Sequence, residues 1–409
     1  MPQHETLVLD PRTLGRRLQE ARKARGLTQQ AAADSLAVAR TTITAIEKGD
    51  RQARPEELVR LASLYGRRVS DLVGPREPIA DFAAQFRTAA VRGAPDDLQE
   101  EMSRALRDFQ DLCQDYLYLE QLSGVSLGPT YPPQYPTAGT APEEAAQDVA
   151  SFERNRLGLG DGPILRLRET LEQDVGLRVF SIGMPSRVAG IFAYTDELGG
   201  CIAVNAHHPG ERRRWSLAHE YAHFLTSRYR SEVSLLGSHR RVPAPERFAD
   251  TFARCLLMPE SGLRRRFNEV VRASGGNVTA ADVCRVAHYY FVSVEAMMLR
   301  LEELGVLPGG TWERLRDRGF KAREAQEHLG LPPHPIDNRL LPSRYEFLAA
   351  RAYEAGALTE GELARLLRTD RVSARRTLQR LGSALHVLEG GEVASLPIDL
   401  AGSVTKLDS

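Results

Sequence analysis

The sequence has few cysteines, no long apolar run and no excess of charge of either sign. Its 4 cysteines in 409 residues are scattered and form no Cys-x-x-Cys pair, which indicates free buried thiols rather than disulfides or a cysteine-based zinc site. No run of about 18 or more apolar residues and no charged-then-apolar leader is present, so we expect neither a membrane span nor a signal peptide. The 54 Lys and Arg balance 54 Asp and Glu, which excludes a polyelectrolyte role for the whole chain. These absences predict a cytoplasmic protein.

The pattern His-Glu-x-x-His occurs once, in a run without glycine or proline that predicts a helix around His219, Glu220 and His223. Two histidines four residues apart on a helix project from one face about 6 Å apart, close enough to share a metal ion. Glu220 lies beside them, where its carboxylate could take a proton from a metal-bound water. The pattern therefore predicts a metal centre with Glu220 as general base.

A second helix is predicted from Pro245 to Pro259, where apolar residues repeat every four positions and Glu246 and Asp250 form an i, i+4 pair. Zinc peptidases of the gluzincin kind take their third ligand from a Glu on such a helix and leave the fourth position to water. We therefore expect Glu246 to bind Zn²⁺ and Asp250 to orient His219 through a hydrogen bond. The alternative is that both carboxylates only stabilise a helix N-terminus.

The region from about residue 143 to 305 resembles the ImmA/IrrE family of metallopeptidases. The resemblance is carried by Ile-Ala-Val-Asn205, then Arg213-Arg-Trp-Ser-Leu-Ala-His-Glu-x-x-His, then Glu246-x-x-Ala-Asp-x-Phe-Ala-x-x-Leu-Leu-Met-Pro. It implies a cytoplasmic zinc endopeptidase whose relatives cut DNA-binding repressors. The family commonly has His-Glu-Leu-Gly-His, and Tyr221-Ala222 replaces Leu-Gly here, which leaves the three expected ligands intact.

The first part of the chain has helix-turn-helix spacing, with Thr28 as the N-cap of one helix and a second helix from Arg40 to Lys48 that ends at Gly49. Across residues 12–73 it resembles the Xre/Cro/C1 repressors, which lay the second motif helix in the major groove of double-stranded DNA. The resemblance implies four exposed DNA-contacting residues, Gln29, Arg40, Thr41 and Thr44, and a core position for Ile43 and Ile46. The alternative is a small helical domain that contacts proteins.

Two positions depart from the repressor pattern. Ala37 replaces the usual turn glycine, and Ala39 replaces the Ser or Thr that usually caps the recognition helix. Both changes should weaken the local structure slightly, and the missing hydroxyl could remove one phosphate contact.

Between these regions we expect a helical linker, over residues 78–87 and 96–121, followed by a Pro/Gly/Tyr-rich linker at 123–142 that could also dock on the peptidase. The apolar residues of the second helix recur by fours and threes, which is typical of a packed or dimerising seam: Met102, Leu106, Phe109, Cys113 and Tyr116. A homodimer would suit a reader of palindromic operators, and a helix packed on its own chain is the alternative.

Strands are expected at residues 178–182, 189–194 and 201–205, ahead of the metal helix. We expect the strand 199–205 to form the sheet edge that pairs with extended substrate. His207 and His208 are expected to be solvent-exposed loop residues rather than ligands, because Glu246 already completes the site. Tyr229, His239, Tyr289 and Tyr290 are candidates for the oxyanion donor. In the following helices Ser293 is the expected cap of one N-terminus.

The C-terminal region again has helix-turn-helix spacing at 343–384, as a helix-turn-helix, a winged unit or a plain helical hairpin. We thus predict a multidomain, mainly α protein. Its parts are an all-α helix-turn-helix domain (11–74), a helical linker (75–122), a Pro/Gly/Tyr-rich linker (123–142), an α+β zincin-like peptidase domain with a small sheet (143–305) and a C-terminal helical region (306–409).

The predicted function is a DNA-binding regulator with a zinc endopeptidase that cuts a partner repressor or itself in a stress, phage or mobile-element response. Two alternatives remain at this point. One is a transcription factor whose peptidase-like part is a sensor or scaffold with little proteolysis, and the other is an antitoxin or phage-type immunity module with the same chemistry. Glu220 favours the enzyme, since a scaffold does not need a general base beside a metal.

Overall fold

The computed structural model describes residues 10–67, 69–73, 96–124, 131–137, 139–230, 232–235, 242–332, 334 and 337–382. The chain divides into two compact units, Met1–Gln85 and Phe86–Ser409, and each is described by itself. The expected helix at 78–87 and the residue His239 lie outside the described residues. No helix of the described part is long and apolar enough to cross a membrane.

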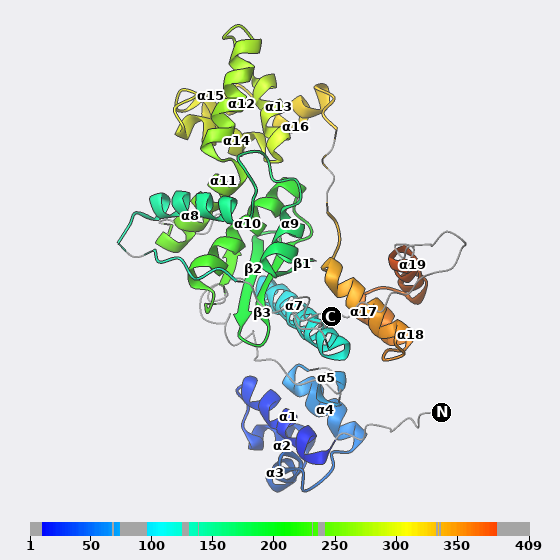
Figure 1. The fold of residues 1–409 in the computed structure, drawn as a ribbon. Helices are drawn as coiled ribbons and strands as arrows, with labels where there is room; N and C mark the ends of the chain where they lie inside the picture. Colours follow the sequence, from blue (N-terminus) through cyan, green and yellow to red (C-terminus); the bar gives the residue numbers. More distant parts are fainter. Residues whose placement is uncertain are drawn as a thin grey trace, which may run out of the picture. The chain divides into compact units, whose positions relative to one another are not determined.

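The first unit is a bundle of short helices around a single apolar core (Figure 1). The helices are α1 (Pro11–Ala24), α2 (Gln29–Leu36), α3 (Arg40–Lys48), α4 (Pro55–Tyr65) and α5 (Val69–Val73). Ile43 and Ile46 are buried in this core, as the helix-turn-helix pattern predicts. Gly15 lets α1 approach α3, because a Cβ at this position would lie 2.4 Å from the backbone oxygen of Ile46.

The turn between α2 and α3 shows the effect of the two departures from the repressor pattern. The Thr28 hydroxyl accepts a hydrogen bond from the backbone N–H of Ala31 at 3.1 Å and caps α2, as expected. Ala37 adopts a left-handed conformation with φ of 56°, which glycine adopts at lower cost. Ala39 occupies the N-cap of α3 and offers no side-chain hydrogen bond. Both positions therefore lack the residue that would stabilise this turn best.

A sheet of four strands forms the centre of the second unit: β1 (Arg178–Ile182), β2 (Val188–Thr195), β3 (Gly199–Asn205) and β4 (Glu232–Leu235). Their order is β1-β3-β2-β4, with β1 parallel to β3 and the other neighbours antiparallel. The prediction that the strand 199–205 is an edge strand is wrong, because β3 pairs with β1 on one side and with β2 on the other. Among the described residues the edges are β1 and β4, and β4 follows the metal helix and returns to pair with β2.

Helices cover both faces of this sheet. On one face, α10 (Gly210–Ser227) packs against β2 and β3 in a core that also includes α8 (Pro142–Arg156), α9 (Leu167–Thr170), the π-helical turn η1 (Leu171–Val175) and α11 (Ala244–Leu257). On the other face lies α7 (Asp96–Ser123), whose Phe109 ring contacts the Phe180 ring of β1 at 6.0 Å. Alternation along β1 explains the two faces, since Val179 belongs to the core beneath α10 and Phe180 meets α7.

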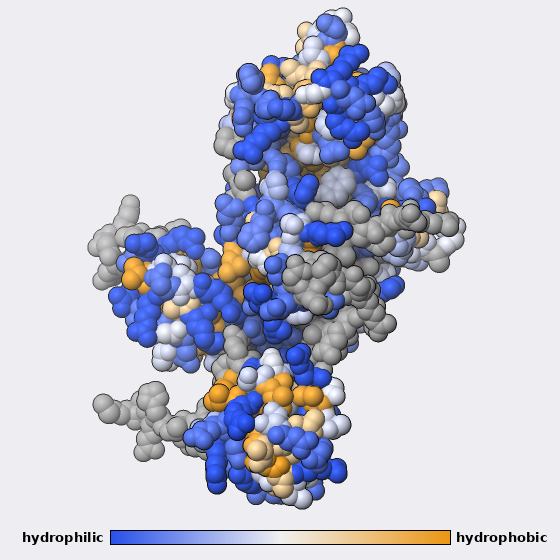
Figure 2. All heavy atoms as spheres, turned by 180° about the vertical axis from the view of Figure 1, so that it is seen from behind, coloured by the Kyte–Doolittle hydropathy of each residue, from blue (hydrophilic) through white to orange (hydrophobic). Residues whose placement is uncertain are grey.

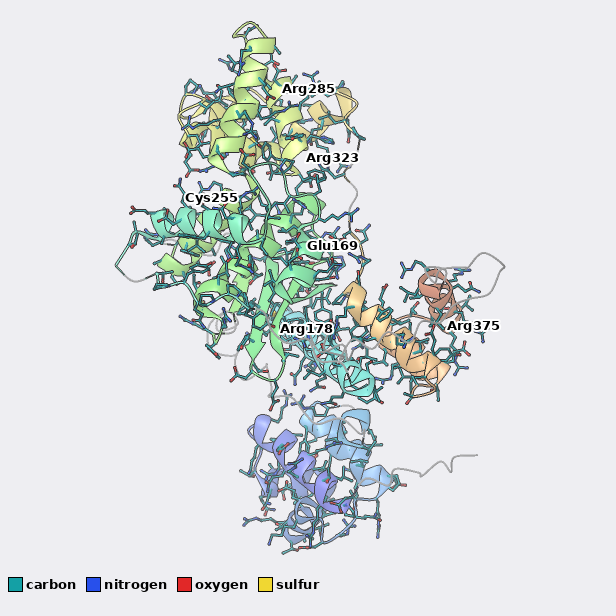
Figure 3. All side chains as sticks on the ribbon, viewed as in Figure 1. Glu169, Arg178, Cys255, Arg285, Arg323 and Arg375 are labelled. Atoms are coloured by element: carbon teal, nitrogen blue, oxygen red, sulfur yellow. The ribbon has the colours of Figure 1, made fainter. Side chains whose placement is uncertain are left out.

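The apolar seam of α7 is buried within its own chain. Met102, Leu106, Phe109, Cys113 and Tyr116 are all buried, and the Tyr116 ring lies 5.6 Å from the ring of Tyr345. This seam is therefore not the exposed dimerisation face that its spacing allowed, and packing onto the same chain accounts for its spacing. The polar side of α7 is also engaged, because Glu120 pairs with Arg178 of β1 at 2.7 Å, a residue labelled in Figure 3.

Two groups of helices complete the second unit (Figure 1). The first comprises α12 (Glu260–Ala273), α13 (Ala280–Tyr290), α14 (Val294–Glu303), α15 (Thr311–Asp317) and α16 (Ala322–His328). Ser293 caps α14, as predicted, and hydrophilic residues dominate the outer surface of this group in Figure 2. The second comprises α17 (Ser343–Glu354), α18 (Glu360–Leu366) and α19 (Arg371–Gly382), and Arg368 joins it to α7 through the buried Asp115 at 3.3 Å.

The Tyr-Pro segment before α8 docks on the C-terminal end of α10. The Tyr131 ring lies 4.9 Å from the Phe224 ring, and its hydroxyl accepts a hydrogen bond from the backbone N–H of Gly200 at 3.0 Å. The Tyr135 hydroxyl donates to Glu153 of α8 at 2.8 Å. This stretch, expected as an extended linker with docking as the second possibility, is thus packed where it is described.

Candidate metal centre

Two helices bring the expected ligands together. His219, Glu220 and His223 lie on α10, and Glu246 and Asp250 lie in the first two turns of α11. The helices are held by aromatic contacts in the core, such as the rings of Tyr221 and Phe252 at 5.9 Å. The i, i+4 spacing on each helix then directs both imidazoles and the Glu246 carboxylate to one point.

The ligand atoms of His219, His223 and Glu246 all lie within 4.8 Å of one another. The two Nε2 atoms are 3.1 Å apart, and the carboxylate oxygens of Glu246 lie 3.3 Å from Nε2 of His219 and 3.6 Å from Nε2 of His223. His223 is nearly fully buried, whereas Glu246 is partly exposed. Two imidazoles and one carboxylate, with one side open to solvent, match the donor set of a catalytic zinc site. No other such group of three occurs among the described residues.

Asp250 holds the far nitrogen of His219. Its Oδ1 lies 3.0 Å from Nδ1 of the imidazole, so the carboxylate accepts the Nδ1 proton and Nε2 faces Glu246. Such a carboxylate fixes both the tautomer and the ring orientation of a metal-binding histidine.

The two histidines have opposite pKa shifts. Burial and the neighbouring His219 lower the pKa of His223 to about 4, so its lone pair is available at neutral pH. Burial also disfavours the charged form of His219. The hydrogen bonds with Asp250 and Glu246 outweigh this effect of burial and raise the pKa of His219 to about 10. A metal ion would therefore compete with one proton, on Nε2 of His219, and its binding should release that proton.

Glu220 is fully buried between α10 and the sheet. Its position depends on Gly190 of β2, because a Cβ at this residue would lie 2.4 Å from Oε1 and 2.9 Å from Cγ of Glu220. Gly190 lies at the irregularity between β2 and β4. Sequence reasoning missed this glycine, and an isolated Gly in a strand, which often marks a close approach, was the available signal.

The substitution of Tyr221-Ala222 for Leu-Gly has a structural role. The Tyr221 hydroxyl donates to the buried carboxylate of Glu153 on α8, and Arg156 donates to the same hydroxyl at 3.0 Å. This buried network fixes the metal helix against α8. Glu153 was also missed, since its partner lies 68 positions away.

The loop after β3 differs in part from expectation. His207 is exposed, as predicted, but His208 is buried, with its Nε2 2.9 Å from the backbone oxygen of Ser186. The expectation of exposure is therefore wrong for His208, because the loop folds back on the segment before β2.

The described candidates for an oxyanion donor have other contacts. Tyr229 packs on Tyr194 with ring centres 5.1 Å apart, Tyr289 lies beneath the guanidinium of Arg266, and Tyr290 is buried. None of these contacts places a hydroxyl at the metal centre.

The predicted DNA-contacting residues divide into two pairs. Arg40 and Thr41 are exposed at the start of α3. Gln29 and Thr44 are only partly exposed, because the Gln29 side chain accepts from Thr44 at 3.2 Å and donates to the buried Glu47 at 2.9 Å. Arg40 and Thr41 are thus exposed as expected, whereas Gln29 and Thr44 are partly exposed and brace α2 against α3.

The fold and the ligand geometry define a metallopeptidase-like domain, which follows a helix-turn-helix domain in the chain. Residues 172–302 match the family model Peptidase_M78, the IrrE N-terminal-like domain, and residues 18–72 match the helix-turn-helix model HTH_3. The chain thus combines an ImmA/IrrE-like metallopeptidase domain with an Xre-type helix-turn-helix domain, as its motifs predicted. No curated protein sequence matches the chain significantly.

Several solved structures align over most of the chain at low similarity. PlcR of Bacillus thuringiensis, in complex with the peptide PapR7 and DNA, is 11% identical over 90% of this chain and 92% of that chain, with a TM-score of 0.18. The apo form of ComR from S. thermophilus is 11% identical over 91% and 95%, with a TM-score of 0.16. ComR from Streptococcus suis is 10% identical over 92% and 94%, also at 0.16.

Proposed function

We propose that the protein is a DNA-binding transcriptional regulator with a zinc-dependent endopeptidase that hydrolyses a peptide bond in a partner repressor or in itself. The observation that carries this proposal is the convergence of His219, His223 and Glu246 within 4.8 Å, with Glu220 beside them on the same helix. A homodimer on a double-stranded operator, and a stress, phage or mobile-element setting, belong to the same proposal. So do the domain limits 11–74 and 143–305.

The residues of the chain divide the chemistry among them. His219, His223 and Glu246 would hold Zn²⁺, and Asp250 would keep Nε2 of His219 directed at it. When bound, the ion supplies a water of lowered pKa and polarises the scissile carbonyl. Glu220 takes the proton of the attacking water on its carboxylate and returns it to the leaving amine.

The DNA-binding half of the proposal is supported by α3. Arg40 and Thr41 are exposed at its N-terminal end, the end that contacts base edges in helix-turn-helix proteins. Gln29 and Thr44 support this helix from within and present their remaining surface beside it.

Glu220→Gln tests the enzymatic half. We expect wild type and Glu220→Gln each to hold about one zinc per chain by elemental analysis, and only wild type to cut a repressor encoded near its gene when the two are co-expressed. His219→Ala should lose the zinc. Equal cleavage by Glu220→Gln would refute the general base, and stoichiometric zinc in His219→Ala would refute the site. Zinc in both chains without cleavage by either would count for a sensor or scaffold.

A further inference from the structure

A cavity of about 580 Å³ lies on the side of α10 away from the metal ligands. It is lined by residues of α9, β1, β3 and the first half of α10 and by His334, Asp337 and Arg339, and Glu169 of α9, which lines it, is labelled in Figure 3. At 100° per residue, Leu217, which lines the cavity, and His219 project about 200° apart on α10. The cavity is therefore separate from the candidate metal centre, and its volume is within the range of small-molecule sites.

Two adjacent arginines of α10 bring positive charge into this cavity. Arg213 is 9% exposed, and its guanidinium donates to neutral groups, the backbone oxygen of Asp337 at 3.2 Å and the side-chain oxygen of Asn338 at 2.9 Å. Arg214 donates to the backbone oxygen of Ile164. The buried Nε atoms of both arginines have no hydrogen-bond partner among the described residues.

Two other arginines of the lining form ion pairs with carboxylates. Arg168 pairs with Glu172 at 2.7 Å, and Arg339 pairs with Asp337 at 2.7 Å. The lining contains five arginines (166, 168, 213, 214 and 339) against the three acids Glu169, Glu211 and Asp337, and Glu172, which pairs with Arg168 from outside the lining, leaves an excess of one positive charge. Arg213 and Arg214 form no ion pair with a carboxylate among the described residues. Arg168 and Arg339 are thus paired with carboxylates, whereas the guanidinium groups of Arg213 and Arg214 are held by neutral oxygens.

Burying unpaired guanidinium groups costs free energy that an anion would recover. Burial lowers the pKa of Arg214 to about 10, which still leaves a cation at neutral pH. A cation held in a low-dielectric cavity interacts with an anion far more strongly than a solvated one does. Arginine also presents a planar fork that matches the oxygens of a phosphate or carboxylate.

The remaining walls are apolar. Val179, Val204 and Leu217 form the floor on the sheet and on α10, and Phe291 stacks beneath the guanidinium of Arg214, 5.3 Å from its ring centre. Leu165 also lines the cavity but is 66% exposed, so it lies at the mouth. The cavity therefore combines a cationic end with an apolar body.

We propose that this cavity binds a small organic anion, with its phosphate or carboxylate on Arg213 and Arg214 and its apolar body between the sheet floor and Phe291. The proposal does not depend on peptidase activity.

The test uses 1-naphthyl phosphate as the probe, in calorimetric titrations of the full chain. We expect one saturable site per chain, with 1-naphthol and inorganic phosphate binding about tenfold or more weakly, because each lacks half of the complementary chemistry. 1-Naphthoate separates the two head groups, since tighter binding of this compound identifies a carboxylate ligand. Absence of saturable binding for both naphthyl anions overturns the proposal.

Variants locate the site. Arg214→Gln should weaken binding by about tenfold or more, whereas Arg212→Gln, an exposed neighbour outside the lining, should change it less than about twofold. Leu165→Asp places a negative charge at the mouth and should weaken binding severalfold relative to the matched Leu165→Asn. Circular dichroism shows whether Arg214→Gln folds. If it does not fold, the comparison of Leu165→Asp with Leu165→Asn tests whether the anion binds in this cavity. Equal binding by Leu165→Asp and Leu165→Asn, or undiminished binding by folded Arg214→Gln, overturns the assignment.

Discussion

At the scale of single residues, Gly190 determines where the carboxylate of Glu220 can lie. A Cβ at this residue would lie 2.4 Å from Oε1 of Glu220, far inside van der Waals contact. We expect Gly190→Ala to displace Glu220 and to lower the rate of peptide hydrolysis by about 100-fold, the size of effect that a misplacement of about 1 Å produces. The zinc content should stay unchanged, because Gly190 contacts no expected ligand in the structure.

Ala193→Gly is the matched control for this substitution. Ala193 is buried on the opposite face of β2, so its replacement changes the strand by one methyl group without reaching Glu220. Steady-state kinetics and elemental analysis of both variants decide the question. Full activity in Gly190→Ala would show that Glu220 has another position available.

The residues of the metal centre could be predicted from sequence because their geometry is local. His219 and His223 share one helix, as do Glu246 and Asp250, and the 3.6-residue period alone places each pair on one face. Gly190 and Glu153 could not be found this way, since their roles depend on contacts 30 and 68 positions away. The partial burial of Gln29 and Thr44 escaped prediction for a similar reason, because it follows from the position of Glu47.

At the scale of elements, a buried ion pair joins α1 to α3. The guanidinium of Arg22 donates to Glu47 at 2.5 and 2.9 Å, and Glu47 also accepts from Gln29 of α2. We expect Glu47→Gln to destabilise the first unit by about 3–5 kcal/mol at neutral pH, because it leaves the Arg22 charge buried without its partner. Hydrogen exchange of residues 11–48, followed by mass spectrometry on the full chain, measures the loss.

The same pair predicts a pH dependence of known sign. Burial of Glu47 raises its pKa, but the hydrogen bonds from Arg22 and Gln29 outweigh burial and leave the pKa below its ordinary value. A lowered pKa contributes stability above the ordinary carboxyl pKa of about 4.3, and this stability is lost as the pH falls through the lowered value. The advantage of wild type over Glu47→Gln should therefore shrink in acid. Thermal unfolding of wild type and Glu47→Gln at neutral and acidic pH tests this. If the stability difference between the two proteins is the same at both pH values, the ion pair is not the source of that difference.

Strands and helices with strong periodicity could be predicted from the sequence, but the elements that pair with them or pack on them in the fold could not. The strand 178–182 and the helices around the metal ligands follow from local pattern, and they are present. The place of β3 inside the sheet could not be derived from local pattern, since it depends on pairing with two other strands, β1 in parallel and β2 antiparallel. The apolar seam of α7 likewise has the same spacing whether it meets a second chain or, as here, Phe180 and Tyr345.

At the scale of the whole molecule, the two units have separate cores. The core of the first unit consists of residues between Leu18 and Leu72, and the large core of the second begins at Ala145. The order of domains was readable from the sequence because each motif is local to its own unit. The cavity on α10 was not, since residues from 165 to 339 line it.

Separate cores predict separable functions. Arg40→Ala should weaken binding to the promoter of the chain's own gene by about 1–3 kcal/mol if Arg40 contacts a base, and it should leave the zinc content unchanged. Glu220→Gln should in turn leave DNA affinity unchanged, because additivity holds for distant sites without shared partners. Fluorescence anisotropy with labelled promoter DNA measures the affinity, with Arg60→Ala on α4 as a control for loss of one exposed positive charge. A DNA affinity that changes in Glu220→Gln would mean that the two units are energetically coupled, and equal losses in Arg40→Ala and Arg60→Ala would remove Arg40 from the base-reading surface.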